Sequence, residues 1–255
     1  MYQFPINQLI PFLVQTALLI ALTVRLCYAR LYRVYPFFFS YIVAQLVQAV
    51  LISAVPYYGK VYTNVWLGTE AVMACFHVLI VGELYRVILR DLTGIATVSR
   101  RYIQISAVFG ILVSLLLFHF EETPANHVSM FLVIERGIAF SLVIFILLGS
   151  AFLVYYPVSL NRNVLLYSIG YSVYFLTKAT ALFIRTLGHY WLPQINTVLL
   201  VVSSACLLFW VLALNREGER RTVQISHKWS PENAERLLLK VREINENLMR
   251  IKQTN

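Results

Sequence analysis

The chain has 255 residues, of which 59% are hydrophobic and only 13% are charged, and its mean hydropathy is +0.70. Soluble domains carry about 45–50% apolar and about 25% charged residues, so this composition excludes an ordinary water-soluble domain and predicts a lipid bilayer as the partner. The formal net charge of +9 does not indicate a nucleic-acid partner, because the basic residues are placed mainly around apolar segments.

Seven apolar segments follow one another along the chain, and each is long enough to cross a bilayer core of about 30 Å. In chain order they are about Ile6–Tyr28, Phe37–Val55, Val61–Leu89, Tyr102–Phe120, His127–Tyr155, Asn163–Leu187 and Gln194–Leu214. They predict an all-α fold, a seven-transmembrane-helix bundle that forms one domain over residues 1–215. No basic residue precedes Arg25, so the first segment is predicted to be a retained helix and not a signal peptide.

Basic residues gather on one side of this predicted bundle. With the N-terminus outside, Lys60 is the only Arg or Lys residue in the predicted outer loops. The cytoplasmic loops of membrane proteins typically carry the excess of Arg and Lys. The cytoplasmic ends would hold Arg25, Arg30, Arg33, Arg86, Arg90, Arg100, Arg101, Arg162, Arg216, Arg220 and Arg221. We therefore expect a multi-pass protein of the plasma membrane, the inner membrane of a bacterium, with its N-terminus outside and its C-terminus in the cytoplasm.

Residues 216–255 form a charged tail that holds 15 of the 33 charged residues of the chain, which are 21 basic and 12 acidic. Ser230 and Pro231 suit the N-cap and first position of a helix, which we expect over about 230–251. Its apolar residues recur with heptad spacing, at Ala234, Leu237, Val241, Ile244, Leu248 and Ile251. This amphipathic cytoplasmic helix would either pack on its own bundle, form a homodimer, or bind a partner in a membrane complex.

Ionisable residues inside the predicted spans are few. Glu70, Glu135, Arg136 and Lys178 lie eight or nine residues below the outer ends of their helices, which is about 13 Å at 1.5 Å per residue. A charge in hydrocarbon is costly, so such residues usually face the interior of a bundle. Two acids and two bases are therefore predicted at one depth.

Other polar residues fall at a similar depth. On the sixth segment Tyr167, Tyr171, Tyr174, Lys178 and Arg185 share one helix face. Gln48 matches the level of Glu70, as do Gln15 and Ser203, and His77 lies two turns below Glu70, where it could also be an ordinary core histidine. The candidate ligand-binding residues are Glu70, Glu135, Arg136, Lys178, Tyr174, Tyr171, His77 and Gln48. They could form a polar cavity open to the outside, or an ion-pair network that only holds the helices together.

Two further groups of charged or metal-ligating residues lie outside this set. Glu83 and Arg86 can pair on one helix face and would anchor the third helix at the interface or contribute to a cytoplasmic gate. His119, Glu121, Glu122, His127 and His189 flank outer turns, but their spacing matches no metal motif, and we expect neither a metal nor a cofactor.

Enzymatic functions known from helical membrane proteins find no matching residues. The seventh segment has no lysine for a retinal Schiff base, and His77 is the only histidine deep in a span, which is too few for a zinc or haem site. We therefore expect a protein that is not an enzyme.

Three runs of residues carry a resemblance: Tyr35-Pro36-Phe37-Phe38-Phe39-Ser40-Tyr41, Glu83-Leu84-Tyr85-Arg86, and the Glu135-Arg136 pair. In these features the chain resembles uncharacterised seven-helix bacterial membrane proteins, and the resemblance implies a membrane bundle without implying an activity. We expect a sensor, receptor or accessory subunit whose tail provides output or assembly. A transporter or channel for a small solute or ion, and a structural subunit of a complex, are the alternatives.

Overall fold

The computed structural model describes residues 6–55, 59–90, 127–155, 159–187, 192–219 and 222–224, with a few short stretches between 104 and 112 and between 235 and 243. Its long helices are α1 (Ile6–Tyr28), α2 (Pro36–Ala54), α3 (Lys60–Arg90), α5 (His127–Tyr155), α6 (Arg162–Leu187) and α7 (Leu192–Ala213). These helices coincide, to within two residues at each end, with six of the seven predicted segments. The prediction of an all-α fold is confirmed.

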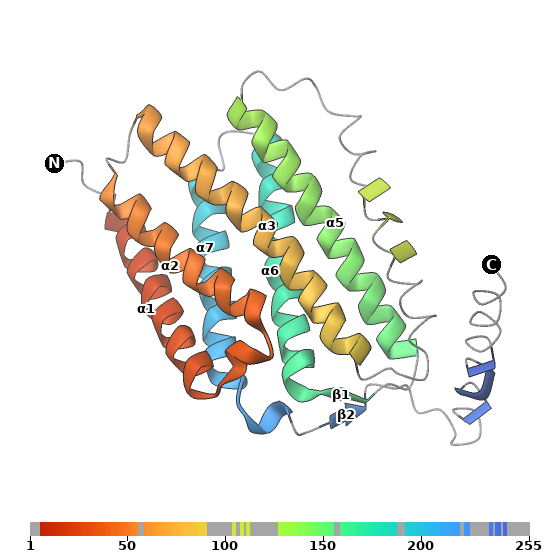
Figure 1. The fold of residues 1–255 in the computed structure, drawn as a ribbon. Helices are drawn as coiled ribbons and strands as arrows, with labels where there is room; N and C mark the ends of the chain where they lie inside the picture. Colours follow the sequence, from red (N-terminus) through yellow and green to blue (C-terminus); the bar gives the residue numbers. More distant parts are fainter. Residues whose placement is uncertain are drawn as a thin grey trace.

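The helices pack side by side into one bundle (Figure 1). Each neighbours the next in the order α1, α2, α3, α5, α6 and α7, and α7 returns to α1, while α3 also contacts α6 across the bundle. In the view of Figure 1, α1, α3, α5 and α7 begin at the upper end, and α2 and α6 begin at the lower end. We use these two names for the ends of the bundle below.

The bundle turns apolar side chains outward as well as inward. Along α1, Leu19, Leu22 and Leu26 are buried at helical spacing, whereas Leu13 and Val24 are more than half exposed. Within the described residues four helical stretches are long and apolar enough to cross a membrane, namely Leu9–Tyr28, Pro36–Ala54, Lys60–Val87 and Met130–Leu148. An apolar outer surface of this kind suits lipid as the surrounding solvent.

At the lower end the chain after α7 is attached to the bundle. The Arg25 guanidinium donates hydrogen bonds to the carbonyl oxygens of Leu214 and Leu212 at 2.7 and 3.3 Å, one in the last turn of α7 and one directly after it. The 3-10 turn η4 (Glu217–Glu219) follows, and the Glu219 carboxylate accepts hydrogen bonds from Tyr35 Oη at 2.7 Å and Asn163 Nδ2 at 2.8 Å. These bonds join α1, α2 and α6 to the segment that follows α7.

A two-stranded antiparallel ribbon lies at the same end, formed by β1 (Ser159–Asn161) and β2 (Thr222–Gln224). Leu160 pairs with Val223 at its centre. This ribbon was not predicted from the sequence, because three-residue strands are too short to show an alternating pattern.

Several predictions fall on residues outside those described. The fourth segment, about Tyr102–Phe120, is described only in short helical stretches, whose side chains are exposed. The tail helix predicted over about 230–251 is described only at 235–236, 238–240 and 242–243. Its heptad residues Ala234, Leu237, Val241, Ile244, Leu248 and Ile251 all lie outside the described residues. The outer-loop histidines and acids also lie outside the described side chains.

Candidate functional site

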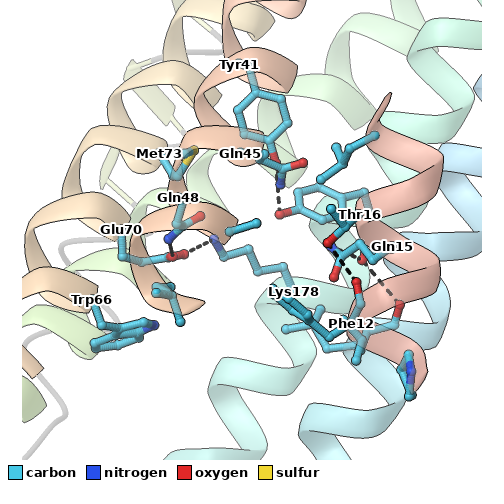
Figure 2. A pocket seen from close by; sticks show the side chains of 18 of the residues that line it. Phe12, Gln15, Thr16, Tyr41, Gln45, Gln48, Trp66, Glu70, Met73 and Lys178 are labelled. Carbon is cyan, nitrogen blue, oxygen red and sulfur yellow. Dashed lines mark hydrogen bonds and ion pairs between the residues drawn. The ribbon is translucent and has the colours of Figure 1, made fainter. Parts of the chain in front are cut away.

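A cavity of about 360 Å³ opens between α1, α2, α3, α6 and α7 in the upper half of the bundle (Figure 2). Along α3 it extends from Tyr62, near the upper end, to His77 near the middle. Its polar lining consists of Gln15, Thr16, Tyr41, Gln45, Gln48, Tyr62, Trp66, Glu70, His77, Tyr174, Lys178, Thr197 and Ser203. Ligand pockets typically have volumes of about 300–1,000 Å³ with a few convergent polar groups, so this cavity suits a small solute.

An ion cluster forms one wall of the cavity. Lys178 Nζ lies 2.9 Å from Glu70 Oε1 and 2.6 Å from Glu135 Oε1, so one ammonium from α6 joins carboxylates from α3 and α5. The Glu70 side chain is 17% exposed, compared with 5% for Glu135 and 7% for Lys178. Glu70 and Lys178 line the cavity, whereas Glu135 contacts Lys178 from outside the lining.

Gln48 extends this cluster onto α2. Its Nε2 donates hydrogen bonds to Glu70 Oε2 at 3.2 Å and to Thr69 Oγ1 at 3.1 Å, and Figure 2 shows Lys178 and Gln48 meeting at the Glu70 carboxylate. Hydrogen bonds to an ionised carboxylate are stronger than those between neutral groups. Four helices therefore meet at one polar centre.

Hydroxyl groups close the lower part of the cavity. Tyr41 Oη donates to Tyr174 Oη at 3.2 Å and accepts from Gln45 Nε2 at 2.7 Å. The buried ring of His77 places its Nε2 3.2 Å from Tyr41 Oη. His77 is thus a hydrogen-bonded histidine on the cavity wall.

Below these hydroxyls lies a layer of buried rings, which we call the aromatic layer: Tyr35, Phe38, Tyr167, Tyr171 and Trp210. Phe38 meets Tyr167 and Trp210 edge-on, with ring centroids 4.8 and 5.2 Å apart. The hydroxyls of Tyr167 and Tyr171 and the indole nitrogen of Trp210 have no hydrogen-bond partner within the described part of the chain. The layer fills the bundle below the cavity with packed rings.

The structure brings together five of the eight predicted site residues on the cavity wall: Glu70, Lys178, Tyr174, His77 and Gln48. Glu135 contacts Lys178 but does not itself line the cavity, and Arg136, also buried, is not part of the lining either. Tyr171 points into the aromatic layer, one turn below Tyr174, where it borders only a very small second cavity.

Gln45 and Tyr41 also line the cavity, but they were not among the predicted site residues. Gln45 and Tyr41 lie on α2 at three and seven residues before Gln48, so they share its helix face. A test of helical spacing around Gln48 would have found both. Trp66, one turn above Glu70 on α3, carries the same signal.

Glu83 has a role that the sequence did not predict. Its buried carboxylate accepts hydrogen bonds from the backbone N–H groups of Phe37 and Phe38 at 2.8 and 3.0 Å, whereas Arg86 is exposed. These N–H groups belong to the first turn of α2, where intrahelical acceptors are lacking and the helix dipole favours a negative charge. Glu83 therefore caps α2 from the neighbouring helix α3.

The fold and cavity define the class of protein. It is a helical integral membrane protein with several spans and a polar cavity among its helices. No family model, curated protein or solved structure matches the chain. Among the described residues no group of three or more His, Cys, Asp or Glu side chains is placed to hold a metal ion.

Proposed function

We propose that the protein is a membrane receptor or sensor that binds a small polar solute in the cavity beside Glu70 and Lys178. The observation that carries this proposal is the cavity itself, about 360 Å³ in volume and lined by polar side chains from five helices. An isolated ion-pair network needs no such space, since buried charges that only join helices pack against protein atoms.

The proposal includes seven spans with the N-terminus outside. It is supported by the charge distribution of the described ends, because Arg30, Arg33 and Arg86 lie at the lower end and Lys60 at the upper end. Loops rich in Arg and Lys remain in the cytoplasm. The cavity would then open toward the outside, and the tail would lie in the cytoplasm as an output or assembly element.

Cysteine labelling tests this orientation. In a variant without Cys27, Cys75 and Cys206, a cysteine placed at Lys60 is expected to react with an impermeant maleimide in intact cells. A cysteine placed at Arg30 is expected to react only after permeabilisation. The reverse pattern would contradict the proposed orientation.

Binding in the cavity is tested by thermal unfolding of the purified protein with a panel of amines, carboxylates, amino acids and sugars. A solute that binds the native state raises the unfolding temperature by mass action. Ala49 lines the cavity, so Ala49→Phe is expected to fill it and to abolish that rise. Val50→Phe is the matched control, because Val50 is 65% exposed on the outer face of the same helix. A rise that survives Ala49→Phe would place binding elsewhere.

A transporter remains the second candidate, because the same charged residues would suit a permeation site. The aromatic layer favours a receptor, since packed rings below the cavity would have to separate for a solute to pass. Uptake of the bound solute into proteoliposomes, abolished by Ala49→Phe, would favour the transporter. Binding without uptake would favour the receptor.

A further inference from the structure

We infer that the solute carries a positively charged amino group, which binds at the Glu70 carboxylate. This inference rests on the proposed function and specifies the class of its ligand. It follows from the charges of the cluster, the free acceptor atoms of the cavity and the rings that surround them.

Charge is the first argument. Two carboxylates, Glu70 and Glu135, contact a single ammonium, that of Lys178. Glu135 makes the shorter contact, 2.6 Å against 2.9 Å, and lies behind Lys178, so the lysine keeps a close counter-ion even without Glu70. Glu70 is the more exposed carboxylate and the one that lines the cavity. An ammonium group of a ligand would be attracted by the negative charge of Glu70, the carboxylate that faces the cavity.

Free acceptor atoms are the second argument. A carboxylate can only accept, so Gln48 must direct its Nε2 to Glu70. Ser203 donates its own hydrogen to the Leu200 carbonyl, so Gln15 must direct its Nε2 to Ser203.

Gln45 follows the same rule. Tyr41 donates its hydroxyl hydrogen to Tyr174, so Gln45 Nε2 donates to Tyr41. All three glutamines therefore commit their nitrogen to protein atoms, and their Oε1 atoms have no partner among the described residues. These oxygens and the Glu70 carboxylate match the several N–H donors of an ammonium group.

Aromatic rings are the third argument. Phe12, Tyr62 and Trp66 line the upper part of the cavity, with Trp66 one turn above Glu70 on α3. The faces of such rings attract cations, and indole is the strongest of them. If the ammonium group of a ligand bound at Glu70, the carbon atoms attached to that group would lie among these rings.

Three probes that share a phenyl ring and differ in charge test the inference: 2-phenylethylamine, 3-phenylpropionate and 3-phenylpropanamide. Binding of each to the full-length protein in nanodiscs is measured by isothermal calorimetry. The amine is expected to bind most tightly, and Ala49→Phe is expected to abolish its binding. Glu70→Gln is expected to raise the Kd of the amine by about tenfold or more, because it removes a charge-assisted hydrogen bond.

Glu135→Gln is the second variant. It leaves Glu70 as the only carboxylate in contact with Lys178, so it is expected to weaken the binding of the amine although Glu135 does not line the cavity. Binding of the neutral amide should change little, and this contrast separates a loss of charge from a loss of folding.

The inference and the proposed function fail in different ways. The inference would be overturned if the carboxylate or the amide bound more tightly than the amine, or if Glu70→Gln left the affinity for the amine unchanged. The proposed receptor would still be supported in that case, provided that Ala49→Phe abolished the binding. Absence of binding sensitive to Ala49→Phe across these probes and the wider panel would overturn both.

Discussion

Tyr171, Tyr174 and Lys178 are three or four residues apart on one face of α6, yet their polar atoms meet different surroundings. Lys178 contacts two carboxylates, and Tyr174 accepts a hydrogen bond from Tyr41. Tyr171, fully buried, stacks on Phe175 with ring centroids 5.3 Å apart, and its hydroxyl has no described partner. Side chains on one face of α6 therefore make different contacts, because different residues of the neighbouring helices lie opposite each of them.

Removing the hydroxyl of Tyr171 should cost nothing. A buried hydroxyl without a partner is unfavourable, so Tyr171→Phe is expected to leave the free energy of unfolding unchanged or to raise it by up to about 1 kcal/mol. Tyr41→Phe is the comparison, because it breaks bonds to Tyr174, Gln45 and His77 and is expected to lower that free energy by about 1–3 kcal/mol. Denaturant titration in mixed micelles measures both. An equal loss in the two variants would mean that the Tyr171 hydroxyl has a partner.

Gly170 lies where α6 meets the Trp210 indole of α7. A Cβ atom at this position would overlap the indole ring, so Gly170→Ala is expected to lower the free energy of unfolding by about 1–3 kcal/mol. Gly82→Ala on α3 is the control, because its added Cβ would meet no atom within 4 Å. Thermal unfolding in detergent should separate the two, and equal stability would contradict the close contact with Trp210.

At the scale of elements, α2 begins with a proline and two phenylalanines and has no side-chain cap of its own. Proline suits the first turn, because its missing N–H would be unsatisfied there in any case. The remaining N–H groups of Phe37 and Phe38 are satisfied by Glu83 of α3. The start of one helix is therefore completed by its neighbour.

Glu83→Ala is expected to lower the free energy of unfolding by about 2–3 kcal/mol, because two buried N–H groups lose a charged acceptor. Arg86→Ala, three residues later and exposed, should change it by less than about 0.5 kcal/mol. Hydrogen exchange at the first turn of α2 should also accelerate in the Glu83 variant alone. A similar loss for both variants would favour the ion pair that the sequence suggested.

At the scale of the whole molecule, the ion cluster joins α3, α5 and α6, and the cavity beside it is bounded by five helices. Contacts between helices in lipid depend on packing and polar bonds, because burying apolar surface offers little gain there. The cluster therefore contributes to the assembly of the bundle as well as to the proposed site.

Lys178→Met should leave the buried Glu135 carboxylate and the half-buried Glu70 carboxylate without their common counter-ion. We expect it to lower the free energy of unfolding by about 3–5 kcal/mol. Adding Glu70→Gln and Glu135→Gln to it should recover part of that loss, since the unpaired charges are then gone. Unfolding titrations of the single and triple variants measure the difference, and a triple variant no more stable than the single one would contradict this electrostatic origin.

Hydrophobicity alone predicted the positions of the six described long helices, because the thickness of a bilayer sets the length of every span. Counting residues from the helix ends also predicted that Glu70, Glu135 and Lys178 share one depth, since each residue advances a helix by a fixed rise. Their ion pairs are consistent with that count. The tail helix and the fourth span stay predictions.

Only the tertiary structure decided which polar residues face the cavity. Depth along a helix follows from the sequence, but the direction of a side chain around the axis depends on the rotation and tilt of the helix against its neighbours. That rotation places Glu135 behind Lys178, turns Tyr171 into the aromatic layer and brings Gln45 to the wall. It also directs Glu83 to the N–H groups at the start of α2. These N–H groups lack acceptors within their own helix, and the packing of α3 against α2 decides which side chain lies close enough to accept their hydrogen bonds.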